Sequence, residues 1–225
     1  SLFCALLIAA GALSHTLLER GVTRVYLAGD EQGVSALVLG GGHAALIGCG
    51  SEKNTAIRSL LSSKMIRTLD VVIFPALAYA AGAGRILDAA EIQTLYAPQD
   101  GAHRSQIDCR QGEWTPQSLP QEPQELWEGV SVRFDSQVCA LILRIGEGEI
   151  AFLVSSDAPT STLSSAIAVA PEGIVRPAAS TLLLTKQNTQ AMAQLAAQGS
   201  AVYAADADSG LCIASRGDNF IIRRS

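Results

Sequence analysis

Several motifs that mark familiar enzyme classes are absent from this sequence. The five cysteines are scattered and form no C-x-x-C pair, which argues against a zinc ribbon or a thioredoxin-type site. Their odd number also argues against a disulfide framework. The chain has no G-x-S-x-G elbow, no P-loop and no G-x-G-x-x-G run, so it lacks the sequence signs of these nucleophile and phosphate-binding sites.

Charged residues are also few. They make up 16% of the chain, with a net charge of −5 and a pI near 5.2. A dedicated nucleic-acid-binding protein usually has a basic face, so this balance argues against one, although it allows a local basic strip. Apolar residues reach 48% over 225 residues, which is enough to bury a sizeable core without metal or disulfide support.

Histidine, the commonest metal ligand, occurs only three times. His15 lies in an apolar segment, His43 at an expected hairpin tip and His103 in a loop over residues 97–112. None has a partner at the spacing of a metal site. We therefore assign all three to surface or structural roles.

The chain begins with an apolar run, LFCALLIAAGAL, over residues 2–13, which continues to residue 18 with three interruptions. A spanning helix needs roughly 20 apolar residues, so three interpretations stay open: the end of a transmembrane helix, a signal-peptide core, or a buried helix. We favour the first. Residues 1–20 are then the end of a transmembrane or hydrophobic leader segment, and residues 22–225 a separate domain.

Within residues 22–225, short apolar strands alternate with helices twice over. A proline- and glutamine-rich connection over residues 98–128 divides the two halves, and we expect Trp127 and Trp114 to hold it against the core. Two such halves predict an α/β sandwich, in which two mixed sheets pack face to face with helices outside. The expected strands are 22–28, 35–39, 44–47, 70–74, 93–96, 130–134, 138–145, 150–154, 182–185, 201–204, 211–215 and 219–223, and the expected helices are 52–64, 85–91 and 189–198.

The stretch DVVIFPALAYAAGAG, residues 70–84, carries the most information about function. In many α/β hydrolases the catalytic groups follow such a strand, but here the loop offers only methyl groups and one polar-tipped side chain, that of Tyr79. Together with VYLAGDEQGVSALVL (residues 25–39) and ALIGCG (residues 45–50), it resembles the C-terminal, metallo-β-lactamase-like domain of ComEC-type competence proteins. The spacing of that family's D-V-G-Q-G-D, L-I-D-x-G and T-H-x-H-x-D-H-x-G-G motifs is kept without gaps.

The departures from the family's pattern fall on the metal ligands. Gly48 replaces the aspartate of the second motif. Later in the chain, Asp157 is the one metal-ligand position that keeps the family's residue. The family's final Asn is also present, as Asn188, but no histidine follows it. The remaining ligand positions hold four alanines, one proline and one glutamate. They are Ala76, Ala78, Ala80, Ala81, Pro171 and Glu172. The resemblance therefore implies a metallo-β-lactamase-like αββα sandwich whose zinc or manganese site has been lost, with no small-molecule cofactor.

The resemblance also implies a cellular setting. It implies a domain of a bacterial cell-membrane protein, on the extracytoplasmic face, whose partner is the transmembrane channel portion of the same protein. DNA is a further partner to consider, and the candidate contacts are Arg216, Arg223 and Arg224.

Two functional hypotheses follow. In the first, the domain is a non-catalytic pseudoenzyme that acts as a scaffold or DNA-guiding surface in DNA uptake. In the second, it is a metal-dependent hydrolase or nuclease with an atypical site around Asp157 and Glu172, helped by Tyr79 and by Asp30 or Glu31. Asp157 is more readily read as the N-cap of a short helix. A third reading is an unrelated secreted or membrane-tethered α/β domain.

Overall fold

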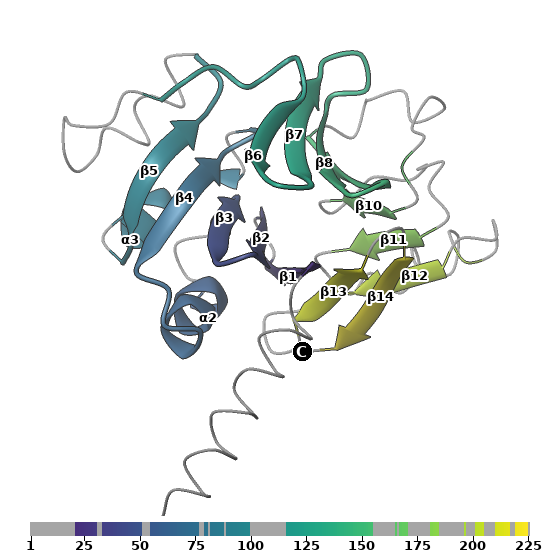
Figure 1. Ribbon diagram of the computed structural model, residues 1–225, viewed down its shortest axis with the longest axis horizontal. Helices are drawn as coiled ribbons and strands as arrows, with labels where there is room; N and C mark the ends of the chain where they lie inside the picture. The colour runs from purple at the N-terminus through teal and green to yellow at the C-terminus, as the bar shows by residue number, and fades with distance from the viewer. Residues whose placement is uncertain are drawn as a thin grey trace, which may run out of the picture.

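The computed structural model contains two seven-stranded sheets packed face to face (Figure 1). It describes residues 21–30, 33–50, 55–76, 79–80, 82–87, 89–99, 116–154, 165, 167–170, 181–184, 196, 201–204, 210–216 and 219–224. The predicted hydrophobic segment, residues 1–20, lies outside this set. Among the described residues, no helix has the length and apolar character needed to cross a bilayer.

The first sheet combines the start and the end of the described chain. Its strand order is β14-β13-β1-β2-β3-β4-β5. Strands β14 through β3 are antiparallel neighbours, whereas β3, β4 and β5 run parallel. The strands are β1 (Val22–Asp30), β2 (Gly33–Gly40), β3 (His43–Ile47), β4 (Thr68–Ile73), β5 (Glu91–Tyr96), β13 (Leu211–Arg216) and β14 (Asn219–Arg224).

The second sheet is mixed in the same way. Its order is β12-β11-β10-β9-β8-β7-β6; β9 to β12 are parallel, and β6 to β9 are antiparallel. The strands are β6 (Gln124–Trp127), β7 (Val130–Asp135), β8 (Ala140–Ile145), β9 (Gly148–Leu153), β10 (Ile167–Ala170), β11 (Thr181–Leu184) and β12 (Ala201–Ala204).

The main core lies between the two sheets. Alternate residues of each strand point inward, as the period of two requires: Val25 and Leu27 of β1 face Ile150 and Phe152 of β9 within one buried cluster. A second cluster lies on the outer face of the first sheet. There Leu46 and Val72 pack with Ile57 and Leu61 of α2 (Ala56–Ser63) and with Ile86 of α3 (Ala83–Leu87).

The sequence-based architecture is therefore confirmed as two face-to-face mixed sheets, with α2 and α3 outside the first. Three predictions of detail are corrected. The helix expected over residues 52–64 begins at Ala56 and ends at Ser63. The one expected over 85–91 is α3, Ala83–Leu87. The connection over residues 98–128 contains a strand, β6, because Trp127 is buried in the core and the segment pairs with β7. Trp114 and most of the helix expected over 189–198 lie outside the described residues.

Candidate functional site

The candidate site lies at the edge where the parallel strands of both sheets end. Strands β3, β4 and β5 all end at one edge of the first sheet, upward in Figure 1. In the second sheet, β9 and β10 are parallel neighbours that end side by side, with Phe152 paired to Val169. Loops that follow the carboxyl ends of parallel strands carry ligands in many α/β proteins.

Tyr79 joins the two sheets at this edge. It belongs to the loop after β4, is 1% exposed, and its hydroxyl donates a 2.7 Å hydrogen bond to the Leu153 carbonyl at the end of β9. Burial raises the pKa of Tyr79 far above its ordinary value of 10.0, so the phenol stays protonated. The chain thus closes the space between the two strand ends with its own side chain, and Tyr79 is unsuited to act as a general base.

The loop after β3 fixes the position of Tyr79. The Cys49 N–H donates to the Tyr79 carbonyl at 2.9 Å, and the Cys49 thiol contacts the same oxygen at 3.3 Å. Gly48 and Gly50, on either side, have φ angles of +69° and +68°. An L-residue with a side chain is strained by about 1–2 kcal/mol in this left-handed region. The backbone at Gly48 therefore suits glycine, and aspartate is among the few other residues that adopt this region.

The described ligand positions hold hydrocarbon, as the sequence predicts. Ala80 is 1% exposed and belongs to the outer cluster, and Ala76 packs against the inner core. Among the described residues there is no group of three or more His, Cys, Asp or Glu side chains that would hold a metal ion. The described part of the site therefore does not fit a zinc or manganese centre, which needs several N, O or S donors. Ala78, Ala81, Asp157, Pro171 and Glu172 lie outside the described residues.

Three of the candidates outside the described residues come, in sequence, after strands that end at this edge. Position 157 follows the end of β9, and positions 171 and 172 follow the end of the neighbouring parallel strand β10. Asp30 ends β1, whose pairing with β2 and β3 places it at the same edge. Glu31 lies outside the described residues.

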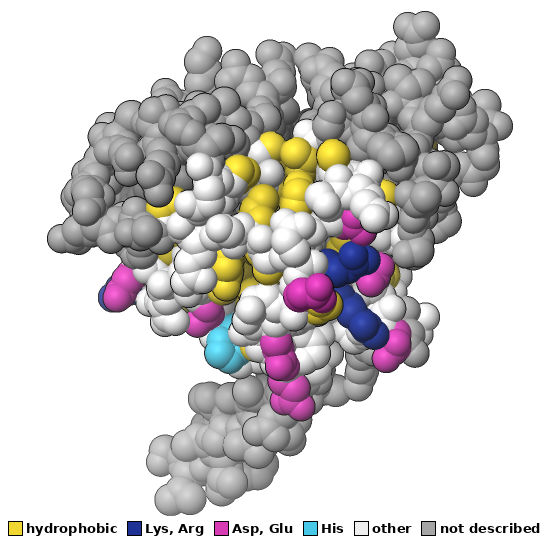
Figure 2. Space-filling model, turned by 90° about the horizontal axis from the view of Figure 1, so that it is seen from above, with side chains coloured by type: hydrophobic (Ala, Val, Ile, Leu, Met, Phe, Trp, Pro, Cys, Tyr) yellow, Lys and Arg dark blue, Asp and Glu magenta, His cyan; other side chains and the backbone are white. Residues whose placement is uncertain are grey.

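Figure 2 gives the view from above Figure 1, onto this edge. Apolar side chains gather in the middle of the described surface, and the described charged side chains lie nearer its margin. A described surface of this kind has little to offer a divalent cation.

The backbone register places the three candidate DNA-contact arginines at different points along the closing hairpin. Arg216 is paired with Asn219 beside the turn, whereas Arg223 is paired with Cys212 near the other end. Arg224 follows Arg223, so its side chain belongs to the opposite face of the strand. Arg223 and Arg224 are both exposed.

His43 has the structural role expected of it, through contacts that the sequence did not indicate. Its ring stacks on Trp127 with centroids 5.5 Å apart, and its Nδ1 lies 3.5 Å from an Asp70 carboxylate oxygen. The same oxygen accepts a 2.8 Å hydrogen bond from the Ala44 N–H. These contacts lie at the beginning of β3 and β4, at the edge opposite the candidate site. Only the three-dimensional pairing of β3 with β4 reveals them.

Comparison with solved structures identifies the fold. YhfI from Bacillus subtilis, described as a metallo-β-lactamase fold protein, superposes with a TM-score of 0.60 at 14% identity, over 85% of this chain and 98% of that one. Igni18, a metallo hydrolase from Ignicoccus hospitalis, gives 0.52 at 12% identity, over 89% and 99%. Zn²⁺-bound PqqB from Methylobacterium extorquens gives 0.52 at 15%, over 79% and 85%.

No protein family and no curated protein matches the sequence itself. At these low identities the structural likeness shows the fold alone. The chain therefore has the metallo-β-lactamase fold.

Proposed function

We propose that residues 22–225 are a non-catalytic, metallo-β-lactamase-fold domain of a ComEC-like bacterial membrane protein for DNA uptake, acting as a scaffold or DNA-guiding surface. The setting comes from the sequence resemblance: the motif frame over residues 25–84 and the apolar run before it. The partner in this proposal is the transmembrane channel portion of the same protein, with DNA as a second partner, and the domain lies on the extracytoplasmic face.

One observation carries the non-catalytic part of this proposal. The loop after β4, where the resemblance places the H-x-H-x-D-H ligands, is bonded directly across to β9 through the Tyr79 hydroxyl. A catalytic metal centre in this fold would need room for an ion, its ligands and a reactive water. Here the buried Tyr79 side chain occupies part of the space between the loop and β9, and the partly buried Ala76 packs against the main core. Buried ligands left without a metal would be costly, and hydrocarbon avoids that cost.

The test is a metal and nuclease assay on the purified 225-residue chain. After incubation with zinc and with manganese followed by desalting, we expect far less than one metal ion per chain and no hydrolysis of single- or double-stranded DNA. PqqB, which binds Zn²⁺, serves as the positive control for the metal measurement. Stoichiometric metal together with DNA hydrolysis would contradict the proposal.

The variant Asp157→Ala separates the two hypotheses. If the domain is non-catalytic, Asp157→Ala changes neither metal content nor background hydrolysis. If an atypical hydrolase site exists around Asp157 and Glu172, the wild-type chain shows activity that Asp157→Ala and Glu172→Ala both lower at least tenfold, since each would remove one of few oxygen ligands.

A further inference from the structure

A second feature lies at the edge opposite the candidate site, where β3 and β4 begin. A pocket of about 890 Å³ opens there on the outer face of the first sheet, between β1, the β2–β3 turn and the end of α2. Three side chains in its lining are permanently basic: Arg24, Lys64 and Arg67. No acidic residue is among the lining residues. We call this the basic pocket.

Two described acidic residues, Asp70 and Glu91, lie near the basic pocket but are not part of its lining. The Asp70 carboxylate accepts the Ala44 N–H and lies beside His43. Glu91 is exposed, and its backbone N–H donates to the Arg67 carbonyl. The described lining residues therefore carry an excess of basic over acidic side chains, in a protein whose overall charge is −5. Such a local excess of one sign attracts anions.

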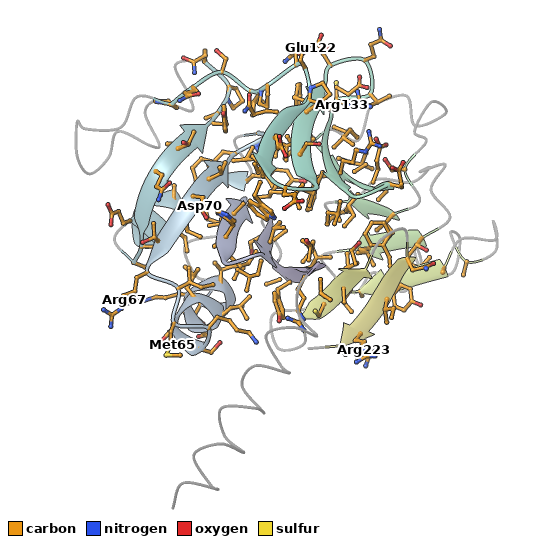
Figure 3. All side chains as sticks on the ribbon, viewed as in Figure 1. Met65, Arg67, Asp70, Glu122, Arg133 and Arg223 are labelled. Carbon is orange, nitrogen blue, oxygen red and sulfur yellow. The ribbon has the colours of Figure 1, made fainter. Side chains whose placement is uncertain are left out.

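Basic charge continues from the pocket onto β14. Lys64 Nζ lies 5.1 Å from the centroid of the Tyr26 ring on β1. Burial raises the pKa of the Cys212 thiol, and the charges of Arg24, Lys64 and Arg223 act in the opposite direction. Figure 3 shows Arg67 and Arg223 on the same, lower side of the molecule. A multivalent anionic surface would contact several of these groups at once.

Met65, at the rim of the basic pocket, is an apolar side chain that the fold does not explain. It follows the C-cap of α2, has a φ of +55° and is 85% exposed. Glycine is the residue preferred at such a helix end. A methionine here keeps backbone strain and exposes hydrocarbon. Figure 3 shows Met65 near Arg67, on the lower side of the molecule.

Chain connectivity indicates what meets this edge. Val22, the first residue of β1, lines the basic pocket, and the apolar run of residues 2–18 precedes it by only a few residues. If that run is embedded in a bilayer, four residues of chain span at most about 14 Å. The pocket then lies within reach of the lipid headgroups.

We infer that the basic pocket and Met65 form a docking surface for the phosphate headgroups of an anionic bilayer, holding the domain's lower edge against the membrane. This inference rests on the proposed membrane setting. Lys64, Arg67 and Arg24 contact headgroup phosphates, and Met65 enters the acyl boundary between them. Single-stranded DNA is the less suitable ligand, because its binding sites use exposed aromatic platforms. Of the two aromatic rings in the described lining, Tyr26 lies under Lys64 and His43 is already stacked on Trp127.

The test measures partitioning of the full 225-residue chain onto vesicles of phosphatidylcholine, alone or mixed with phosphatidylglycerol. The site variant is Lys64→Gln with Arg67→Gln. The matched control is Arg133→Gln with Arg144→Gln, which removes two charges from β7 and β8; Arg133 lies at the upper end of Figure 3. Each basic residue near an anionic surface contributes roughly fivefold in affinity. We expect the affinity of the site variant for the mixed vesicles to fall about 30-fold, the effect of two lost basic residues. Its affinity for neutral vesicles should not change, because only the apolar run binds them.

The control variant should bind the mixed vesicles within a fewfold of wild type. Equal losses in the two variants, or no loss in the site variant, would overturn the inference. If the site variant lost binding to a labelled single-stranded oligonucleotide while its vesicle binding was unchanged, the pocket would be a nucleic-acid site instead. The vesicle measurements do not depend on metal content or DNA hydrolysis. This inference can therefore be contradicted while the non-catalytic proposal stands, and the reverse.

Met65→Gly provides an independent test that does not endanger the fold, because glycine relieves the positive φ. We expect unchanged or higher stability in urea, and severalfold weaker partitioning onto both kinds of vesicle. Partitioning equal to wild type would contradict insertion of Met65.

Discussion

At the scale of single residues, Tyr79 holds two strand ends together, a role that a metal ion has in many hydrolase sites. Its hydroxyl links the loop after β4 to the Leu153 carbonyl of β9, and its own carbonyl accepts from Cys49. All of these atoms are buried. The phenol therefore has a structural function, and its loss would leave a buried carbonyl without a hydrogen-bond donor.

We expect Tyr79→Phe to lower the free energy of unfolding by about 1–3 kcal/mol near pH 7, the cost of leaving a buried acceptor unsatisfied. The pH dependence should change as well. Above pH 10.0 the unfolded chain ionises Tyr79 while the folded chain keeps it protonated. Stability is therefore complete below pH 10.0 and falls as pH rises, by up to about 1.4 kcal/mol per pH unit.

Urea unfolding between neutral and alkaline pH checks both parts of this prediction. Above pH 10.0, Tyr79→Phe should make the free energy of unfolding less dependent on pH, by the amount expected for the ionisation of one group. Tyr203→Phe is the matched control, because Tyr203 is 41% exposed and should leave stability and slope unchanged. A wild-type slope retained in Tyr79→Phe would show that another group dominates.

At the scale of elements, the two sheets meet closely where β14 crosses the start of β9. Gly148 has no side chain, and a Cβ added there would overlap the Phe220 ring of β14. Phe220 packs against the main core. The φ of Gly148 is not in the left-handed region, so the demand for glycine comes from space rather than from backbone strain.

Gly148→Ala should therefore cost about 1–3 kcal/mol, the usual range for overpacking. The same substitution in a Phe220→Leu background should cost less than half of that, because the smaller side chain leaves room for the added methyl group. A double-mutant cycle in urea measures the coupling. Additive losses would indicate that the sheets do not touch at this point.

The elements that the sequence predicted well are those with a strong local pattern. Short apolar runs bounded by turn residues predicted β1, β8 and β9, and the closing hairpin was expected at the positions where β13 and β14 lie. Strand β6 was missed because it has four residues inside a proline- and glutamine-rich stretch, and only its pairing with β7 reveals it.

For the candidate site, the prediction that metal ligands are missing depends on residue type and spacing alone, and it stays a prediction. It did not predict the hydrogen bond from Tyr79 to Leu153, which joins residues 74 positions apart. It also did not predict the basic pocket. Lys64 and Arg67 lie in the connection between α2 and β4, whereas Arg24 lies on β1, and the pairing of the strands brings this connection beside β1.

At the scale of the whole molecule, the first sheet depends on contact between the beginning and the end of the domain. β1 pairs with β13, which pairs with β14, so the last two strands cover what would otherwise be a free edge of β1. An exposed edge of this length invites association with other chains. The domain is thus complete only when its C-terminal hairpin has docked.

Two isoleucines of this hairpin test that dependence. Ile213 of β13 is fully buried in the main core, whereas Ile221 of β14 is 51% exposed. We expect Ile213→Ala to lower the free energy of unfolding by about 2–5 kcal/mol through the cavity it leaves, and Ile221→Ala to change it by less than about 0.5 kcal/mol. Urea unfolding measures both, and size-exclusion chromatography should show self-association only for Ile213→Ala. The two substitutions remove the same atoms, so equal losses would mean that the inward face of the hairpin does not hold it against the core. The pairing of β13 and β14 with the first sheet would then be contradicted.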